Sequence, residues 1–311
     1  GLVGSEMCIR DRLKVEENDT KIENIFHFAD IHIRLNSRFE EYKYVFESVY
    51  KKLNRYKEDG IVNAIVCIAG DIVHSKIELS PECIMETYNF FRDLSSIYPT
   101  IIIGGNHDTL LTNKNRIDSL SAIVYERPLS NFYFLKSTGM YRYNNLVFFI
   151  DSLFDEKEID MTSSNPVLDE MKKDNLIPIT IFHGSIPGWR NTRNFVSKEG
   201  DKYLSEMNGM SLCMLGDIHM YQIMNEENPK ALYSSSLISQ NFGETDVNHG
   251  FVKHNIEYDG KEHKLSHEYV RVLNKYRFQD IFVKNEGQSI MTDGKIYKIC
   301  LLYTSPSPRD R

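Results

Sequence analysis

Five short apolar segments each run directly into polar residues that bind metal ions, and this repeated junction constrains the fold more than any other feature. The segments are read as buried strands, because they are nearly continuous apolar runs that are shorter than typical helices. A glycine stands next to the polar residues in four junctions, where it lets the backbone turn tightly. In chain order the polar residues are Asp30 and His32, then Asp71, then Asn106, His107 and Asp108, then His183, and finally Asp217 and His219.

The first three of these strands alternate with two helical patterns. The expected order is strand 24–29, helix 39–60, strand 62–70, helix 80–97 and strand 99–105. Ser80 is expected to cap the second helix, with Pro81 at its first position. A β-α-β-α-β order predicts parallel strands joined by right-handed crossovers.

The later part of the chain has a different rhythm. Residues 131–152 are read as a three-stranded meander that turns at Asn144, and residues 155–176 as a polar, mobile loop. Further strands are expected at 177–184, 211–217, 231–237, 250–258 and 263–272. The chain is therefore predicted to be an α/β protein.

The five polar junctions are expected to meet, because ligands of α/β sheets bind at the carboxyl ends of the strands. Alone, each junction could be an ordinary turn with a surface histidine, but their joint occurrence favours a metal site. Carboxylate, imidazole and amide ligands suit Mn²⁺, and Zn²⁺ or Fe²⁺ less exclusively. A carboxylate can bridge two such ions about 3.5–4 Å apart, where they clamp a phosphate and acidify water.

The stretches "FADIH", "IAGDIVH", "GGNHD", "FHG" and "LGDIH" resemble the motifs of the calcineurin-like metallophosphoesterases over residues 24–257. The resemblance implies an α/β/β/α sandwich of two mixed sheets with a site for two divalent ions, expected to be Mn²⁺. It also implies that hydroxide formed at the metals attacks phosphorus, that His107 donates a proton to the leaving oxygen, and that Asp108 orients His107. It assigns Asp30, His32, Asp71 and His219 to one ion, and Asp71, Asn106, His183 and position 217 to the other.

Position 217 departs from the family pattern, which usually has histidine where this chain has Asp217. Aspartate is a hard oxygen ligand that binds Mn²⁺ or Mg²⁺ well. Ligation is the expected role, and the alternative is that only His219 is functional while Asp217 points elsewhere.

Finer features resemble the SbcD-type nucleases of DNA double-strand-break repair. These are the motif Gly70-Asp71-Ile72-Val73-His74 and the serine-rich stretch 231–244. The resemblance implies DNA as substrate, a homodimer, an SbcC-type coiled-coil ABC ATPase as partner, and a DNA contact at His74. Arg190 and Trp189 follow the His183 junction and are candidate substrate contacts, although a plain surface loop is an equal alternative for them.

Two other functions stay open. One is a phosphomonoesterase or small-molecule phosphodiesterase on the same fold, and the other is a non-catalytic binding scaffold. The net charge of −7 is unusual for a protein that binds DNA unaided. A metal centre or a partner would then have to supply much of the attraction for phosphate.

Cysteine content and hydropathy narrow the setting. Cys67, Cys83 and Cys213 lie in or beside apolar stretches without disulfide or zinc spacing. Buried thiols fit a reducing, cytoplasmic compartment. No apolar run approaches the roughly 18 residues of a membrane span.

Both ends of the sequence resemble translated sequencing adapter. One choice of codons for residues 300–310 has a reverse complement that encodes residues 2–11. Residues 1–12 and 300–311 are therefore expected to be artefacts, and such ends indicate an environmental fragment of microbial or viral origin. The nuclease domain is expected at 13–272, followed at 273–299 by the start of a truncated capping domain.

Overall fold

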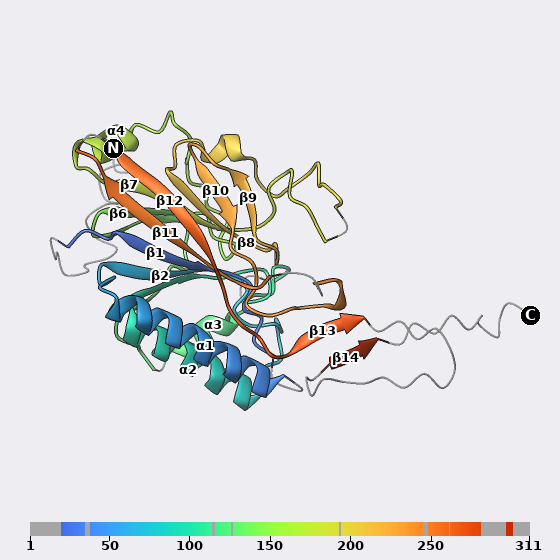
Figure 1. Cartoon of the computed structure of the whole chain (residues 1–311). Helices are drawn as coiled ribbons and strands as arrows, with labels where there is room; N and C mark the ends of the chain where they lie inside the picture. The colour runs from blue at the N-terminus through green and yellow to red at the C-terminus, as the bar shows by residue number, and fades with distance from the viewer. Residues whose placement is uncertain are drawn as a thin grey trace, which may run out of the picture.

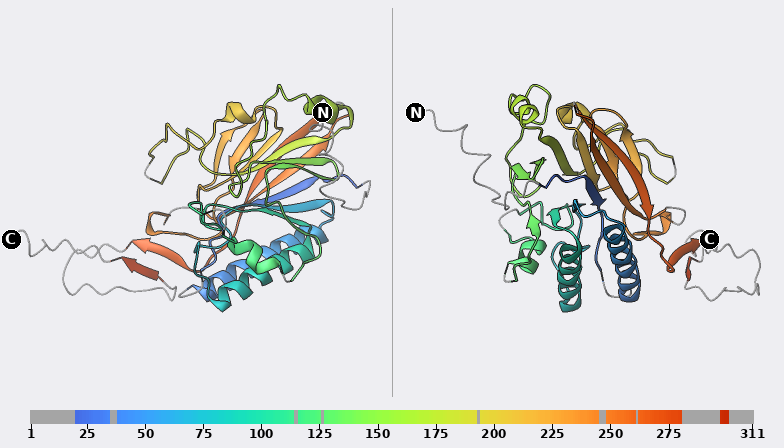
Figure 2. Two further views of the ribbon diagram at one scale, coloured as in Figure 1. Left: turned by 180° about the vertical axis from the view of Figure 1, so that it is seen from behind. Right: turned by 60° about the vertical axis from the view of Figure 1, so that its left-hand side comes forward.

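Two mixed sheets packed face to face form the centre of the protein, as the sequence predicted (Figure 1). The structure is a computed structural model that describes residues 20–34, 38–113, 116–125, 127–192, 194–244, 248–260, 262–280 and 297–300. Helices cover the outer face of each sheet, which gives the α/β/β/α sandwich (Figures 1 and 2).

The first sheet has six strands. Their order is β12 (His263–Arg271), β11 (Gly250–Tyr258), β1 (Asn24–Phe28), β2 (Ala64–Ala69), β3 (Thr100–Ile103) and β4 (Phe132–Phe134). Strands β1 to β4 run parallel, whereas β11 and β12 are antiparallel to their neighbours. This arrangement confirms the predicted β-α-β-α-β frame.

The second sheet also has six strands. Their order is β5 (Gly139–Tyr143), β6 (Leu146–Ile150), β7 (Ile177–His183), β8 (Leu212–Gly216), β10 (Lys230–Tyr233) and β9 (Gln222–Asn225). Strands β6, β7, β8 and β10 are parallel, and antiparallel strands form both edges. The strand at β9 was not expected, because its four residues carry little apolar pattern.

Helices α1 (Phe39–Glu58) and α2 (Pro81–Ile97) lie together below the first sheet, with the short α3 (Ser119–Val124) beside them (Figures 1 and 2). The apolar stripe of α1 is buried as the periodicity predicted, from Tyr42 to Leu53. Ser80 caps α2 by accepting a hydrogen bond from the Cys83 amide at 3.2 Å. These helices pack on Phe26, Val66 and Ile102, so the first sheet is apolar on both faces.

The core between the sheets consists of the side chains that point the other way. From the first sheet these include Ile25, Ile65 and Cys67, and from the second Ile181 and Met214. Cys67, Cys83 and Cys213 are buried and free, which confirms their reading as structural thiols. Among the described residues, no helix is both long and apolar enough to cross a membrane.

Two expectations about the later chain need correction. The meander over 131–152 is split, because β4 joins the first sheet while β5 and β6 form a hairpin at the edge of the second. The polar loop 155–176 contains helix α4 (Val167–Lys173), which buries Leu168 and Met171 on the outer face of the second sheet. Leu168 and Met171 are the only buried residues of this short helix, so its pattern was too weak to identify.

The predicted terminal regions are covered only in part. Beyond β12, strand β13 (Arg277–Asp280) pairs in parallel with β14 (Tyr297–Cys300). The expected adapter-derived segments lie outside the described residues, apart from Cys300 at the end of β14. The division into a nuclease domain and a capping domain stays a prediction.

A pair of histidines lies unexpectedly deep in the sandwich. His27 of β1 and His254 of β11 are both fully buried, with their rings stacked at 5.7 Å. Burial lowers the pKa of His27 to about 3 from its usual 6.5. Between these pH values the unfolded chain binds a proton that the folded protein does not, so acid favours unfolding.

Replacing His27 with phenylalanine should therefore make the free energy of unfolding less sensitive to acid pH. Between pH 7.5 and pH 5, the free energy of unfolding should fall by about 2 kcal/mol more in the unmodified protein than in the variant. Urea unfolding at both pH values measures this, and the difference at pH 7.5 corrects for packing changes. An unchanged pH dependence would show that His27 is not held neutral.

Candidate metal centre

The carboxyl ends of β1, β2, β3, β7 and β8 meet where the two sheets approach each other. Backbone hydrogen bonds join the turns after these strands, including Asp30 N to Gly70 O at 3.1 Å. Gly70 has φ of +80°, and a Cβ there would lie 2.6 Å from the His183 ring. A Cβ at Gly105 would lie 2.2 Å from the Asp71 carboxylate. The glycines in these motifs are thus required by close packing around the site.

Four of the predicted ligands have a backbone conformation that non-glycine residues seldom adopt. Asp30, His32, Asp71 and Asp217 have φ of +54°, +49°, +53° and +93°. Such strain costs on the order of 1–3 kcal/mol per residue and clusters at functional sites. This backbone conformation directs the side chains of these four residues toward the same space.

Two groups of side chains have the spacing of a pair of metal sites. The ligand atoms of Asp30, His32 and His219 lie within 4.8 Å of one another, and so do those of Asp30, Asp71 and His183. Asp71 faces both groups, since Oδ2 is 3.4 Å from His32 Nε2 and Oδ1 is 3.3 Å from His183 Nε2. This is the geometry expected of a bridging carboxylate.

His183 and His219 each direct a ring nitrogen into this space. His183 Nδ1 lies 2.7 Å from the Ala69 carbonyl, so in the neutral ring the proton is on Nδ1 and the buried Nε2 is free. His219 Nδ1 is bonded to Glu244 Oε1 at 2.9 Å, which directs its Nε2 toward the centre, where it lies 3.1 Å from His32 Nε2. Both rings are therefore oriented as metal ligands.

The charges of the site also call for cations. Burial raises the pKa of Asp30 to about 7. Burial opposes protonation of His183, yet the Asp71, Asp30 and Asp217 carboxylates raise its pKa well above the ordinary value. A divalent ion would satisfy this excess negative charge in place of a proton, so the residues fit the two-ion centre.

Asp217 points into the second half of the centre. Its Oδ1 accepts a hydrogen bond from Asn106 Nδ2 at 3.2 Å and lies 3.9 Å from His183 Nε2. Its backbone amide donates to Asp30 Oδ1 at 3.0 Å. The carboxylate thus lies beside Asn106 and His183, the two residues expected to share its ion.

Glu244 is a neighbour of the centre that the sequence reading missed. Its carboxylate is buried and accepts hydrogen bonds from His219 Nδ1, the Gln240 amide and Asn241 Nδ2, at 2.9, 2.7 and 2.6 Å. A carboxylate behind a histidine fixes the ring and makes it a more basic ligand. The only signal was its place in the serine-rich stretch, because nothing in the spacing showed that it folds back to His219.

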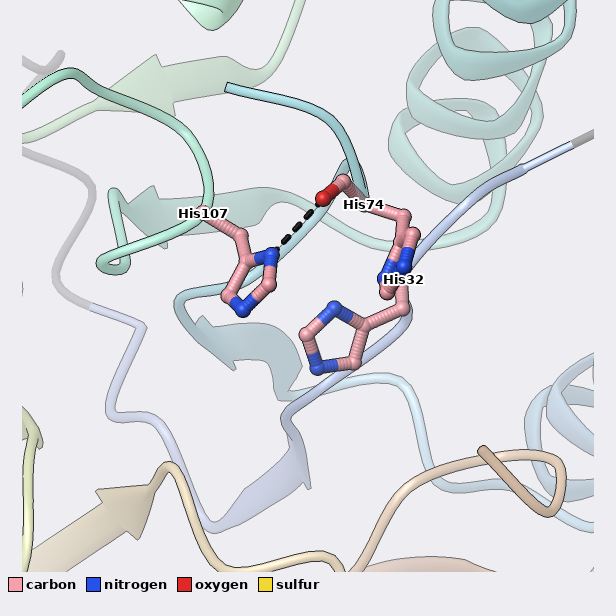
Figure 3. A group of neighbouring side chains, drawn as sticks. All are labelled: His32, His74 and His107. Atoms are coloured by element: carbon pink, nitrogen blue, oxygen red, sulfur yellow. Dashed lines mark hydrogen bonds between the residues drawn. The ribbon is translucent and has the colours of Figure 1, made fainter. Parts of the chain in front are cut away.

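His107 lies next to the metal centre, but its support differs from the expectation (Figure 3). Its Nδ1 is 2.7 Å from the His74 carbonyl, and its amide donates to Asp71 Oδ1 at 2.8 Å. Asp108 accepts hydrogen bonds from the Ile72, Val73 and Gly105 amides instead. Asp108 therefore ties the second and third turns together, and the His74 carbonyl takes the orienting role expected of Asp108.

His32, His74 and His107 form a third group whose ligand atoms lie within 4.8 Å of one another (Figure 3). A third ion is disfavoured there, because the Arg34 guanidinium lies 3.1 Å from His74 Nε2. Burial and Arg34 together lower the pKa of His74 to about 4. This face of the centre presents three imidazole rings backed by the Arg34 cation, which suits contact with a phosphate.

A pocket of about 500 Å³ opens beside the centre. Arg190 is exposed at its wall, and Gln222 fixes the backbone of Arg190 by accepting from its amide and donating to its carbonyl, at 2.7 and 2.8 Å. The lining residues are Trp189, Arg190, Asn191, Thr192, Asp217, Ile218, His219, Met220, Asn241, Gly243 and Glu244. The pocket thus joins the loop after β7 to the metal centre, whereas His74 is not among its lining residues and lies with His32 and His107.

Removing the Asp217 carboxylate should empty half of the centre. We expect Asp217→Ala to bind one Mn²⁺ per chain and Asp217→His to bind two, because histidine restores a ligand. Metal analysis after gel filtration gives the stoichiometry. Two ions in the alanine variant would show that Asp217 is not a ligand.

Glu244→Gln should weaken metal binding without abolishing it. Loss of the charged acceptor behind His219 should reduce Mn²⁺ affinity about 10- to 100-fold in calorimetric titrations. Glu226→Gln is the matched control, since Glu226 is exposed and pairs with Lys230. Equal affinities for both variants would refute the role of Glu244.

Comparisons with known proteins agree with this geometry. A model of the calcineurin-like phosphoesterase family matches residues 23–221. An uncharacterized protein of Acanthamoeba polyphaga mimivirus is 36% identical over 284 residues, covering 89% of this chain and 20% of that protein, so the chain spans about a fifth of this relative. The solved structure of Haemophilus influenzae NAD nucleotidase aligns with a TM-score of 0.41 and 10% identity, over 81% of this chain and 49% of the other. That structural likeness is too distant to carry an argument.

The family match and the buried aspartate–histidine centre together identify the chain as a metal-dependent member of the calcineurin-like phosphoesterases.

Proposed function

We propose that the chain hydrolyses phosphodiester bonds in DNA, as the nuclease of an SbcD-type end-processing system. The observation that carries this proposal is the pocket beside the metal centre, which combines an aromatic ring, a cation and amides. The Gly70–His74 motif and the serine-rich stretch after the last metal motif support the same subfamily.

The pocket has the chemistry to hold a nucleotide next to the metals. Its volume of about 500 Å³ is within the range of ligand sites. Trp189 offers a surface for stacking a base, which is worth about 1–3 kcal/mol. Arg190 can pair with a phosphate, and the Asn191 and Asn241 amides can hydrogen-bond a base edge. A phosphomonoesterase acting on small molecules would have less need for such an extended wall.

The residues around the centre divide the reaction between them. When bound, the two ions supply charge for the phosphate and acidify water at neutral pH. The His74 carbonyl holds His107 Nδ1, so Nε2 is the atom that can pass a proton to the leaving oxygen. His74 stands across from it as a substrate contact, with its ring stacked on that of His107 at 5.2 Å.

Further components are proposed with this activity. The acidic chain carries a net charge of −7, so the ions and a partner would provide much of the attraction for DNA. We propose Mn²⁺ as the metal, a homodimer as the working unit and an SbcC-type coiled-coil ATPase as the partner. We also propose that the chain acts as part of a longer protein, because it spans 20% of the length of its viral relative.

The first test is hydrolysis of linear DNA in the presence of Mn²⁺, beside a small aryl phosphodiester and an aryl phosphomonoester. We expect DNA cleavage that EDTA abolishes, and a loss of about 10²- to 10⁴-fold in His107→Asn, since a general acid contributes about this much. Activity on the small esters alone would favour the small-molecule enzyme. A chain that is inert on all three and binds no metal would favour the scaffold.

The same assay tests the pocket. Trp189→Ala should raise KM for DNA about tenfold, in line with one lost stacking contact, and leave KM for the aryl phosphodiester unchanged. Trp189→Phe should keep most of the affinity, and Tyr203→Ala, an exposed aromatic outside the lining of this pocket, is the control. If Trp189→Ala had the same KM for DNA as the unmodified chain, the pocket would not be the site that binds DNA.

A further inference from the structure

Arg34, in the turn after β1, holds a fixed position between two other segments of the site. Its Nη2 donates to the backbone carbonyl and side-chain oxygen of Gln240 at 2.6 and 2.9 Å. Its Nη1 lies 3.1 Å from His74 Nε2. The side chain is only partly exposed, so the guanidinium is a built part of the centre.

The contact with Arg34 determines which nitrogen of His74 carries the proton. A guanidinium has donors and no acceptor, so His74 Nε2 must be the acceptor and must be unprotonated. The proton of the neutral ring is then on Nδ1, which is buried and has no hydrogen-bond partner within the described part of the protein. Arg34 therefore fixes both the orientation and the tautomer of His74.

Holding His74 also holds His107. The His74 amide donates to the Ile33 carbonyl at 3.2 Å, and the His74 carbonyl lies 2.7 Å from His107 Nδ1 (Figure 3). The two rings stack at 5.2 Å with 20° between their planes. A chain of contacts thus runs from Gln240 through Arg34 and His74 to His107.

We propose that Arg34 is a positioning residue for protonation of the leaving group, acting on His107 through His74. The proposal rests on the proposed phosphodiesterase function, with His107 as proton donor. Arginine suits this role because its planar fork serves two partners at once, which the single ammonium of lysine cannot do with the same geometry.

Leaving groups of different basicity separate this role from a general loss of structure. A p-nitrophenyl diester releases a stable anion and has little need of a proton, whereas the dinucleotide thymidylyl-thymidine releases an alkoxide that must be protonated. Arg34→Met should lower kcat for the dinucleotide about tenfold and kcat for the aryl diester less than about twofold, because only the first needs the acid. Arg34→Lys should lie between the unmodified chain and Arg34→Met. Equal losses on both substrates, or no loss on either, would overturn the proposal.

A second measurement is independent of turnover. Long-range ¹H–¹⁵N NMR of the full chain should show His74 as the Nδ1–H tautomer, and this preference should disappear in Arg34→Met. Arg92→Met, which removes an exposed arginine of α2 paired with Asp93, should leave the His74 signals unchanged. An Nε2–H tautomer in the unmodified chain would refute the proposal, even if the chain proved inactive on every phosphodiester and the proposed function failed.

Discussion

Buried negative charge is the constraint on which the rest of the structure depends. Asp30 and Asp71 are almost fully enclosed, and Asp217 stands beside them at the edge of the pocket. Unpaired carboxylates in such a place are costly, and the protein carries backbone strain at all three positions to bring them together. The glycines beside the ligands, the tautomers of His183 and His219, and the supporting carboxylate of Glu244 all follow from the need to hold cations there.

Much of the fold could be predicted because its strands are buried on both faces. Continuous apolar runs such as β2 contrast clearly with the amphipathic α1 and the capped α2, and the β-α-β order then leaves few topologies. Weakly patterned elements were lost for the opposite reason. Helix α4 has only a few apolar contacts. The three residues of β4 carry no signal that this strand belongs to the first sheet rather than to the second.

The candidate site divides along a similar line. Residues that directly follow strands could be predicted, because strand ends in a parallel sheet share one edge. Residues that support them from a distance in sequence could not. Glu244 lies 25 residues from His219, and Arg34 lies 206 residues from Gln240, with no periodicity to connect them. Asp108 shows the converse error, since its neighbour in sequence, His107, is not its partner in space.

The centre lies across the seam between two sheets that share no strand. Asp30, His32 and Asp71 extend from the first sheet, whereas His183, Asp217 and His219 extend from the second. A slide of one layer over the other by a fraction of an ångström would therefore change the distances between ligands of the same ion. The side chains that set the layer spacing, such as Cys67, Ile181 and Met214, lie in the dry interior, and protein interiors of this kind resist compression. The packing of an apolar core that no ion touches thus helps to determine which metal radius the centre accepts.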